Sequence, residues 1–378
     1  MNQAKHILVT APLGFGGITS MMINIQKNID RDKINFDYLV LHDRHEDLED
    51  VVIKMGSQKL IASADDINNK WHRGFVRWYR LYRVFKDNDI KVLHLNGGPA
   101  SDMTMVFIAK LAGVKHVTFH SHNAGNAVYR NKISVAMSKI FKLFMPFFVD
   151  EFWACSSLAA QFSFPKSIVK NQKYKFIPNG IALEKFSYNA PVREEMRKNL
   201  GVEDKFVIGH AGRFNIQKNH EYLIEIFSAL HSKCPDTVLL LFGDGELYKI
   251  IQDKVKKLNL EGSVRFMGTT DEMPKMYQAM DVFVMPSLCE GLPVAGVEAQ
   301  ASGLPVILAD TITKEVGVTD CVKYLPLLDD KTEWVREILN FRGFKRYSRC
   351  EELKRAGFDE KDVARNFQNY YLKVLENL

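Results

Sequence analysis

The sequence predicts an α/β protein of two Rossmann-like, doubly wound domains, each built on a parallel sheet, and three observations support this. The chain has 378 residues, which is long for one core when a domain averages about 150 residues. Short β-rich runs alternate with longer helical patterns, as in parallel sheets with helices on both faces. The alternation breaks and restarts once, after the turn signal Pro178-Asn179-Gly180. Two such domains would face each other across a central cleft, with ligands beyond the carboxyl ends of the strands.

The predicted strands fall into one group on each side of that break. The first group covers 6–11, 36–41, 90–95, 116–120, 151–154 and 175–177, and the second covers 206–211, 238–242, 264–267, 282–285 and 306–309. We therefore expect an N-terminal domain at 1–187 and a C-terminal domain at 188–360. A final helical segment, 361–378, packs on the second domain or crosses back to the first.

Composition sets broad limits on what the protein can be. With 46% hydrophobic and 25% charged residues, the chain is that of a folded globular protein. Its five cysteines include no C-x-x-C pair, which argues against a zinc ribbon or a disulfide framework and favours a reducing cytoplasm. The apolar run at the N-terminus is too short for a signal peptide, and no stretch approaches the roughly 18 apolar residues of a membrane span. The net charge of +6 favours anionic partners without identifying one.

A glycine-rich turn follows the first predicted strand. Gly14, Gly16 and Gly17 lie where backbone N–H groups could approach a phosphate beside a helix N-terminus. The dinucleotide fingerprint is incomplete, because Thr19 stands where its last glycine belongs. A tight strand-to-helix turn explains the motif about as well as a ligand does.

Two cations follow the first strand of the second half. Arg213 and Lys218 precede a predicted helix, and together they suit a diphosphate, since Arg can bind it bidentately while Lys adds a point charge. A solvated surface pair is the alternative. Asp244 and Glu246, in Gly-Asp-Gly-Glu after the next strand, are better explained by a glycine-flanked turn with Asp as a helix cap than by a metal site.

Histidines end the strand at 116–120. His120 and His122 lie at a carboxyl end and could hydrogen-bond a hydroxyl or share a proton. A structural or merely exposed role is equally compatible with the sequence.

Two carboxylates, Glu290 and Glu298, lie in an otherwise small and apolar segment. On one helix they would be about 12 Å apart along the axis and could not flank one reacting bond. Pro293 suits the first turn of a helix, which places Glu290 in the preceding loop and Glu298 one to two turns in. The N–H groups near Val294–Gly296 would then face a phosphate, with carboxylates for hydroxyls on either side. Ordinary ion-pair partners are the alternative.

Two segments of the first half are basic and amphipathic. Aromatic residues and arginines interleave at helical spacing in 71–86, and 129–144 has a similar character. Each is explained by an ordinary helix with its aromatic stripe in the core, yet such helices can also lie on an anionic bilayer. On the second interpretation, replacing Arg73 and Arg80 with Glu lowers binding to liposomes.

Glu290-x7-Glu298, followed by Gly303-Leu-Pro305, resembles the signature of the retaining glycosyltransferases of family four, which have the GT-B fold. The other motifs of that family's pattern are also present, namely Gly212-Arg213 with Lys218-Asn219, Pro178-Asn179-Gly180, Gly243-Asp244-Gly245, Phe266-x-Gly268 and Pro286-Ser287. The resemblance spans nearly the whole chain. Gln300 departs from the usual Met after Glu-Ala.

The resemblance implies residue roles. Arg213 and Lys218 would hold the diphosphate of a nucleotide-sugar donor, Glu298 its ribose and Glu290 the transferred sugar, with His120 near that sugar. The implied donor contacts also include Gly16, Gly17, Gly291, Leu292, Val294 and Ala295. No metal, cofactor or nucleic acid is implied.

The implied reaction is retaining transfer without an obvious protein nucleophile. It moves the sugar from UDP-hexose or UDP-N-acetylhexosamine to a saccharide or lipid-linked saccharide in exopolysaccharide or capsule synthesis. Charge on the leaving diphosphate would be stabilised by the two cations and the helix N-terminus. The resemblance places the protein in the cytoplasm, peripheral at the inner face of the membrane. The rivals are a nucleotide-sugar epimerase of the same fold and a non-catalytic nucleotide-sugar-binding protein, while the missing glycine disfavours a dehydrogenase.

Overall fold

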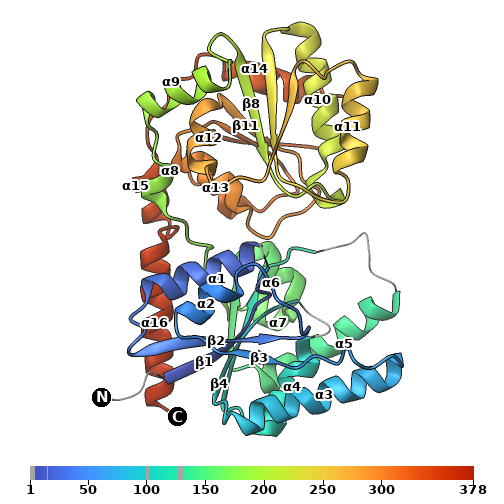
Figure 1. The fold of residues 1–378 in the computed structure, drawn as a ribbon, viewed down its shortest axis with the longest axis vertical. Coiled ribbons are helices and arrows are strands. Elements are labelled where there is room, and N and C mark those ends of the chain that lie inside the picture. Colours follow the sequence, from blue (N-terminus) through green and yellow to red (C-terminus); the bar gives the residue numbers. More distant parts are fainter. Residues whose placement is uncertain (1–4, 15, 99–101, 126–131) are drawn as a thin grey trace. The chain divides into compact units, whose positions relative to one another are not determined.

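A computed structural model describes residues 5–14, 16–98, 102–125 and 132–378 (Figure 1). The chain forms two compact units, each with its own sheet. Unit 1 comprises residues 1–181 together with 360–378, and unit 2 comprises residues 182–359. The end of the chain therefore belongs to the same unit as its beginning.

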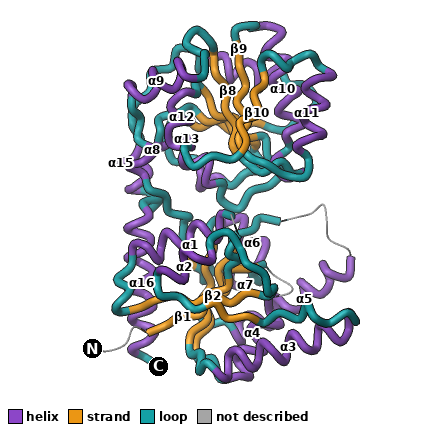
Figure 2. The backbone as a smooth tube through the Cα atoms, viewed as in Figure 1, coloured by secondary structure: helices purple, strands orange, loops and turns teal. Residues whose placement is uncertain are grey.

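Unit 1 is built on a seven-stranded sheet in the order β3-β2-β1-β4-β5-β6-β7, and its strand pairs are parallel. Its central strands are buried because helices cover both faces (Figure 2). The strands are β1 (Lys5–Thr10), β2 (Ile34–Val40), β3 (Lys59–Ile61), β4 (Val92–Gly97), β5 (His116–Ser121), β6 (Glu151–Ala154) and β7 (Lys175–Phe176).

The strand order assigns the helices of unit 1 to two faces. From β1 to β3 the chain steps one way across the sheet, and from β3 to β7 it steps the other way. Since parallel crossovers are right-handed, the helices of these two runs cover opposite faces. The first run contains α1 (Gly17–Asn28) and α2 (Glu49–Lys54), and the second contains α3 (Lys70–Asp87), α4 (Asp102–Ala112), α5 (Lys132–Phe148), α6 (Ser157–Ser163) and α7 (Lys166–Lys170).

The last helix, α16 (Glu360–Glu376), packs against α1 and β2 and so completes the first face. Its buried side chains, Val363, Ala364, Phe367 and Tyr371, join the same core as β1 and β2. At its start the backbone comes close to Gly180, where an added Cβ would lie 2.9 Å from Cα of Glu360. A glycine is thus required where α16 meets the end of unit 1's main segment.

Unit 2 is built on a six-stranded parallel sheet in the order β10-β9-β8-β11-β12-β13. The strands are β8 (Phe206–Ala211), β9 (Thr237–Phe242), β10 (Val264–Gly268), β11 (Val282–Met285), β12 (Val306–Ala309) and β13 (Val322–Leu325). The helices are α8 (Leu183–Phe186), α9 (Ala190–Asn199), α10 (His220–Lys233), α11 (Tyr248–Lys257), α12 (Met273–Ala279), α13 (Val294–Ala301), α14 (Thr332–Asn340) and α15 (Cys350–Arg355), with 3-10 turns η1 (Ile216–Lys218) and η2 (Lys314–Val316).

The predicted fold class is confirmed, and the sequence missed only short strands at sheet edges. β3 and β13 lie at the ends of their sheets and have three and four residues. Their side chains are largely half-exposed, because edge strands are short and carry polar residues. Neither therefore shows the continuous apolar run that predicted the central strands. Among the helices of the described residues, none is long and apolar enough to cross a bilayer.

Candidate functional site

The candidate site lies where unit 2's strand order reverses. The chain runs outward from β8 to β10 and then returns to β11 on the other side of β8. In such sheets the loops after the two central strands diverge, which leaves room for a ligand at their carboxyl ends. The loop after β8 carries Arg213 and Lys218, and the loop after β11 carries Glu290.

Lys218 is held by the short turn η1. The Asn215 side chain caps this turn by accepting a hydrogen bond from the Lys218 N–H at 3.0 Å. The next residue, Asn219, adopts φ 55° and ψ 46° and donates from its side chain to the Pro286 carbonyl at 3.1 Å. Asparagine tolerates this left-handed conformation better than most residues. The turn is thereby fixed to the loop after β11.

A charged pair joins the two loops. Lys218 Nζ lies 2.8 Å from Glu290 Oε1, and their side chains are only 16% and 8% exposed. Gln217 Nε2 donates to the Cys289 carbonyl at 2.8 Å and to Glu290 Oε2 at 3.3 Å. Both charges are therefore largely desolvated and paired with each other. The pairing holds a carboxylate and an ammonium side by side between the loops after β8 and β11.

Arg213, in contrast, is exposed. Its side chain is 73% accessible and lies 3.5 Å from Glu246, itself 55% accessible. A contact this exposed contributes little energy, so the guanidinium can move to an anionic ligand. Arg213 also lines a pocket of about 350 Å³ at the carboxyl ends of β8, β9 and β10. The pocket is lined by Ala211, Gly212, Arg213, Phe242, Gly243, Asp244, Gly268, Thr269, Thr270 and Met273.

Two glycines after β9 allow its loop to lie against the loop after β8. Gly243 and Gly245 have φ of +126° and +156°, and an added Cβ would lie 2.2 Å from Gly212 O and 2.5 Å from Phe214 O respectively. The turn expected there is present. Asp244 does not cap a helix, however, because the next helix begins at Tyr248 with Leu247 at its N-cap. The Asp244 carboxylate instead accepts a hydrogen bond from the Gly245 N–H at 2.7 Å. In the described part of the chain, no three His, Cys, Asp or Glu residues are grouped as metal ligands.

Helix α13 begins as the sequence predicted, with Glu290 in the preceding loop and Glu298 within the second turn. Pro293 is one residue earlier than expected, at the N-cap. The first-turn N–H groups, Val294 and Ala295 among them, lie before the first intrahelical hydrogen bonds and can point at an anion. Gly291 and Leu292 are buried, whereas Val294 and Ala295 are half-buried.

Glu298 is bonded to a buried tyrosine. The hydroxyl of Tyr277, on α12, donates to Glu298 Oε2 at 2.9 Å. Burial raises the pKa of Glu298 to about 7, and the Tyr277 hydrogen bond opposes that rise. The other carboxylate oxygen remains available to accept a hydrogen bond.

Gln300 has a structural role that the sequence did not reveal. Its Nε2 donates to the carbonyls of Gly296 and Val316 at 2.9 and 2.7 Å, and its Oε1 accepts from the Val318 and Thr319 N–H groups at 3.1 Å. The fully buried amide therefore ties α13 to the segment after η2. A methionine could make none of these bonds.

In unit 1, the glycine turn after β1 is open. An added Cβ on Gly14, Gly16 or Gly17 would meet nothing within 4 Å, and none of the three has a left-handed φ. Thr19 is buried, and its hydroxyl donates to the Pro12 carbonyl at 2.6 Å. The threonine thus closes the turn where the fingerprint would place a glycine, and neither backbone conformation nor crowding by the described residues requires Gly16 or Gly17.

His120 lies in a different environment from the one expected of a ligand-contacting group. Its ring is fully buried on the face of the sheet that α16 covers, with ring centroids 5.7 Å from Trp153 and 6.2 Å from Phe367. Burial lowers its pKa well below the usual value. In this structure His120 is therefore a neutral core residue.

The neighbouring His122 is hydrogen-bonded to Asn96, which belongs to none of the predicted motifs. Asn96, at the end of β4, donates from Nδ2 to the Thr10 carbonyl at 3.0 Å, so its Oδ1 is the atom that faces His122 Nε2 at 2.8 Å and His94 Nε2 at 3.2 Å. Both Nε2 atoms must carry the proton. Burial lowers the pKa of His94 and His122 to about 3, so both rings are neutral at physiological pH.

The structure thus brings Lys218, Glu290 and the start of α13 together within unit 2, with Arg213 and the pocket beside them. Gln217 and Tyr277, which orient the two glutamates, were not predicted. Gln217 lies inside the stretch that holds Arg213 and Lys218, so its position was a usable signal. Tyr277 had none, because its contact with Glu298 joins two helices separated by a strand.

Comparison with known proteins shows what this chain is similar to. Residues 192–320 match the family described as Glycosyl transferases group 1. The chain is 30% identical to a putative glycosyltransferase, EpsF, of Bacillus subtilis (strain 168), over 98% of this chain and 97% of the relative. It is 29% identical to an Escherichia coli UDP-Gal:alpha-D-GlcNAc-diphosphoundecaprenol alpha-1,3-galactosyltransferase over 61% of this chain and 60% of that enzyme.

Solved structures show the same fold. Anabaena Alr3699/HepE, crystallised in complex with UDP and glucose, superposes with a TM-score of 0.73 at 15% identity over the full length of both chains. WaaG, a glycosyltransferase involved in lipopolysaccharide biosynthesis, gives a TM-score of 0.64 at 13% identity over 97% of this chain and 95% of its own. The two-unit architecture is the GT-B fold.

Proposed function

Because this chain belongs to the Glycosyl transferases group 1 family, we propose that it moves a hexose or N-acetylhexosamine from a UDP-sugar to a saccharide or lipid-linked saccharide in exopolysaccharide or capsule synthesis. The observation that carries the proposal is the Lys218–Glu290 pair, 2.8 Å apart at the point where unit 2's strand order reverses. An ammonium and a carboxylate side by side, next to a helix N-terminus, suit a ligand that joins a diphosphate to a polyol.

In the proposed complex, the Lys218 ammonium contacts the diphosphate as well as Glu290. Arg213 binds the diphosphate from the solvent-exposed side. The first-turn N–H groups of α13, from Val294 and Ala295, complete the phosphate site. Glu290 accepts hydrogen bonds from hydroxyls of the transferred sugar, and Glu298 accepts them from the ribose. The backbone of Gly291 and Leu292 lines the donor, and the pocket beside Arg213 receives the nucleoside.

The chemistry is differential stabilisation of the leaving group. As the bond to the anomeric carbon breaks, negative charge grows on the diphosphate, and the two cations with the helix N-terminus stabilise it more in the transition state than before. We propose that the acceptor hydroxyl attacks from the face that the diphosphate leaves, which retains the anomeric configuration, and that its proton passes to the departing phosphate. These cations would supply the charge in place of a metal ion, and no cofactor is included in the scheme.

Unit 1 supplies the acceptor side of the proposed complex. The open backbone of Gly16 and Gly17 would approach the donor phosphates, and unit 1 would bind the acceptor. For His120 to contact the sugar, its ring would have to leave the packing of Trp153 and Phe367. His122, which is 9% exposed at the strand's end, is better placed. The Escherichia coli relative, which is named for a diphosphoundecaprenol-linked substrate, supports the proposed position at the inner face of the membrane.

The proposal is tested by nucleoside diphosphate release. UDP-sugars are first screened by thermal shift, and the best ligand is then incubated with and without acceptor saccharides in the presence of EDTA. We expect release that depends on acceptor, survives EDTA and gives a product whose anomeric configuration, measured by NMR, matches the donor. Inversion or complete loss in EDTA would contradict the proposed mechanism.

The same assay separates the rivals. An epimerase would convert the UDP-sugar, or release UDP from it, without any acceptor. A non-catalytic binding protein would show the thermal shift but no turnover with any acceptor offered.

A further inference from the structure

Eight large apolar side chains on α3 and α5 are exposed and take no part in the site described above. They form two stripes that we call the docking surface. It consists of Phe75, Trp78, Tyr79 and Tyr82 on α3, exposed by 71, 51, 57 and 36%, and Ile140, Leu143, Phe144 and Phe147 on α5, exposed by 48, 68, 46 and 79%.

The two stripes have the same helical spacing. In each helix the exposed residues lie at positions i, i+3, i+4 and i+7, which places them along one side. Each helix also has buried side chains, Leu81 and Phe85 in α3 and Met145 in α5. The core of unit 1 is therefore already supplied, and the exposed stripes are additional to it. A soluble surface rarely carries this many adjacent large apolar side chains without a partner.

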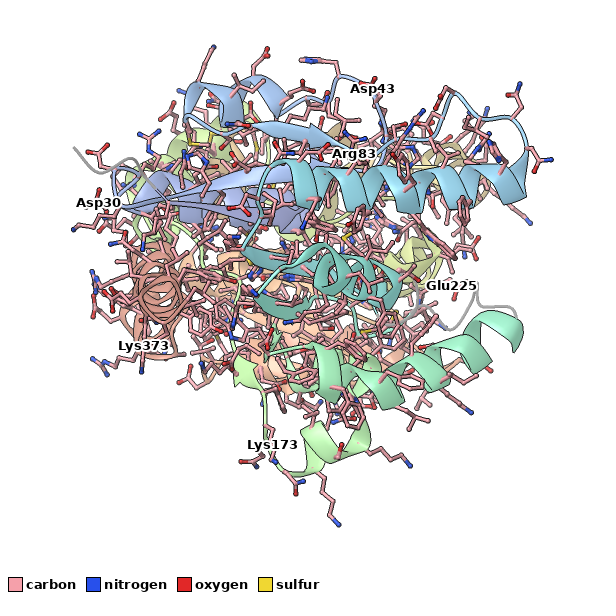
Figure 3. The ribbon with its side chains drawn as sticks, turned by 90° about the horizontal axis from the view of Figure 1, so that it is seen from below. Asp30, Asp43, Arg83, Lys173, Glu225 and Lys373 are labelled. Atoms are coloured by element: carbon pink, nitrogen blue, oxygen red, sulfur yellow. The ribbon has the colours of Figure 1, made fainter. Side chains whose placement is uncertain are left out.

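The stripes belong to neighbouring helices of one layer. Both α3 and α5 pack against α4, and Figure 3, where Arg83 marks α3, shows them on either side of it. At the end of α4, Leu111 is 77% exposed. The apolar side chains thus come from three adjacent elements on one face of unit 1.

The same three helices concentrate positive charge. They contain ten Lys and Arg residues and two Asp residues, a formal charge of +8, compared with +6 for the whole chain. The rest of the chain is thus slightly acidic. An anionic surface would be attracted to this face in particular.

We propose that the docking surface seats unit 1 on an anionic lipid bilayer. Trp and Tyr rings favour the headgroup level, Phe and Leu side chains reach the acyl boundary, and Lys and Arg lie over lipid phosphates. A bilayer is favoured over a protein partner because the two stripes flank α4 instead of forming one groove, and because the three helices keep an excess positive charge of +6 after the pairing of Arg80 with Asp66 and of Lys110 with Asp150 is subtracted from their formal +8. The surface stands on its own geometry, and it deepens the proposed function by bringing the enzyme to lipid-linked acceptors.

The arginines that the sequence suggested as probes are unsuitable. Arg73 Nε donates to the Ile67 carbonyl at 2.6 Å, and Arg80 bonds Asp66 at 2.7 and 2.8 Å. Both anchor α3 to the preceding loop. Their replacement by Glu would disturb the helix whether or not it contacts lipid.

The test uses the exposed apolar residues instead. The full chain is co-sedimented with vesicles of phosphatidylcholine containing phosphatidylglycerol, and with vesicles of phosphatidylcholine alone. The variants are Leu143→Ser with Phe147→Ser, and Phe75→Ser with Trp78→Ser. The matched control is Ile250→Ser with Leu328→Ser, two unit 2 side chains that are 51 and 57% exposed. Thermal unfolding and the shift produced by UDP check that each variant is folded with its donor site intact.

We expect wild type and control to bind the anionic vesicles, to bind neutral vesicles more weakly, and to release from anionic vesicles at high salt. Each docking-surface variant should bind at least roughly tenfold more weakly, because apolar insertion supplies much of the affinity. Absent binding, unchanged binding by both variants, or equal binding to neutral vesicles would overturn the proposal. So would a wild-type dimer that the variants dissociate in sedimentation velocity, since a second copy would then cover the surface. Vesicle binding is measured without nucleotide, so its outcome is independent of the transferase assay.

Discussion

The ends of the two sheets differ in how far their loops are fixed. In unit 2, the loops after β8, β9 and β11 are joined by the Lys218–Glu290 pair, the Gln217 hydrogen bonds and two close glycine approaches. In unit 1, the loop after β1 is bonded by Thr19 and by the Leu48 N–H, which donates to the Leu13 carbonyl at 2.9 Å, and a Cβ added at its described glycines would meet nothing within 4 Å. The loops at this end of unit 2 are therefore fixed by one another, whereas the backbone of the described glycines in unit 1 is accessible.

Removing the Glu290 carboxylate should have the largest effect on activity. We expect Glu290→Ala to lower kcat/KM for sugar transfer by about 10³-fold, because positioned polar groups that act in the transition state contribute on this scale. UDP affinity should stay the same or rise, because Lys218 loses its partner and is freed for the diphosphate. Isothermal titration with UDP and a transfer assay measure the two effects. Parallel losses of both would show that Glu290 supports the fold and not the sugar.

Arg213 should have the next largest effect. Arg213→Ala is expected to lower kcat/KM about 10²-fold and to weaken UDP binding, since a charged contact to the leaving phosphates is lost. Arg213→Lys should recover part of it. The control is Arg336→Ala, which removes another largely exposed arginine, 64% accessible, that pairs only with neighbouring glutamates. Equal activity of Arg213→Ala and the control would remove Arg213 from the site.

Two glycine substitutions test whether the turn in unit 2 is more crowded than the turn in unit 1. Gly243→Ala should destabilise the fold by roughly 2 kcal/mol or more, because its φ is +126° and its Cβ would lie 2.2 Å from Gly212 O. Gly17→Ala should leave thermal stability unchanged or slightly raised, since its Cβ meets nothing within 4 Å at the start of α1. It should nevertheless raise the KM for the donor. A destabilised Gly17→Ala would mean that this turn is as crowded as the one in unit 2.

The smallest effect concerns pH. Burial raises the pKa of Glu298 to about 7, so the carboxyl becomes protonated as the pH falls from 8 to 6, and in the proposed complex it then accepts weaker and fewer hydrogen bonds from the ribose. We expect the KM for the donor to rise up to about tenfold over this range in wild type. Glu298→Gln should show the higher KM at both pH values. A wild-type KM that is flat with pH would argue against the ribose contact.

Glu298 also predicts a stability effect of definite sign. Its folded pKa lies above its unfolded value of 4.5, so the folded protein binds more protons and loses stability as the pH rises towards and past 7. Without ligand, Glu298→Gln should therefore unfold at a higher temperature than wild type at pH 8, but not at pH 5. Equal differences at both pH values would show that the carboxyl is not buried in its charged form.

The sequence predicted the central strands and the start of α13 because these features depend on the local residue pattern. Continuous apolar runs mark buried parallel strands, and Pro293 followed by small residues marks a helix start. His120 shows where this kind of inference fails. Strand position indicates that a side chain lies near a carboxyl end, but the packing of α16, more than 240 residues away in the chain, decides that the ring faces the core.

The fold class, the two-part division and the loops that carry charge follow from the amino-acid sequence, because periodicity, turn residues and motif order are local properties of the chain. Only the tertiary structure decided which charges are paired, as with Lys218 and Glu290, and which are anchored, as with Arg80 and Asp66. It also decided that the aromatic stripe of α3 faces solvent, since one helical pattern can serve a core or a surface. Burial and partners are set by segments distant in sequence, which no local pattern contains.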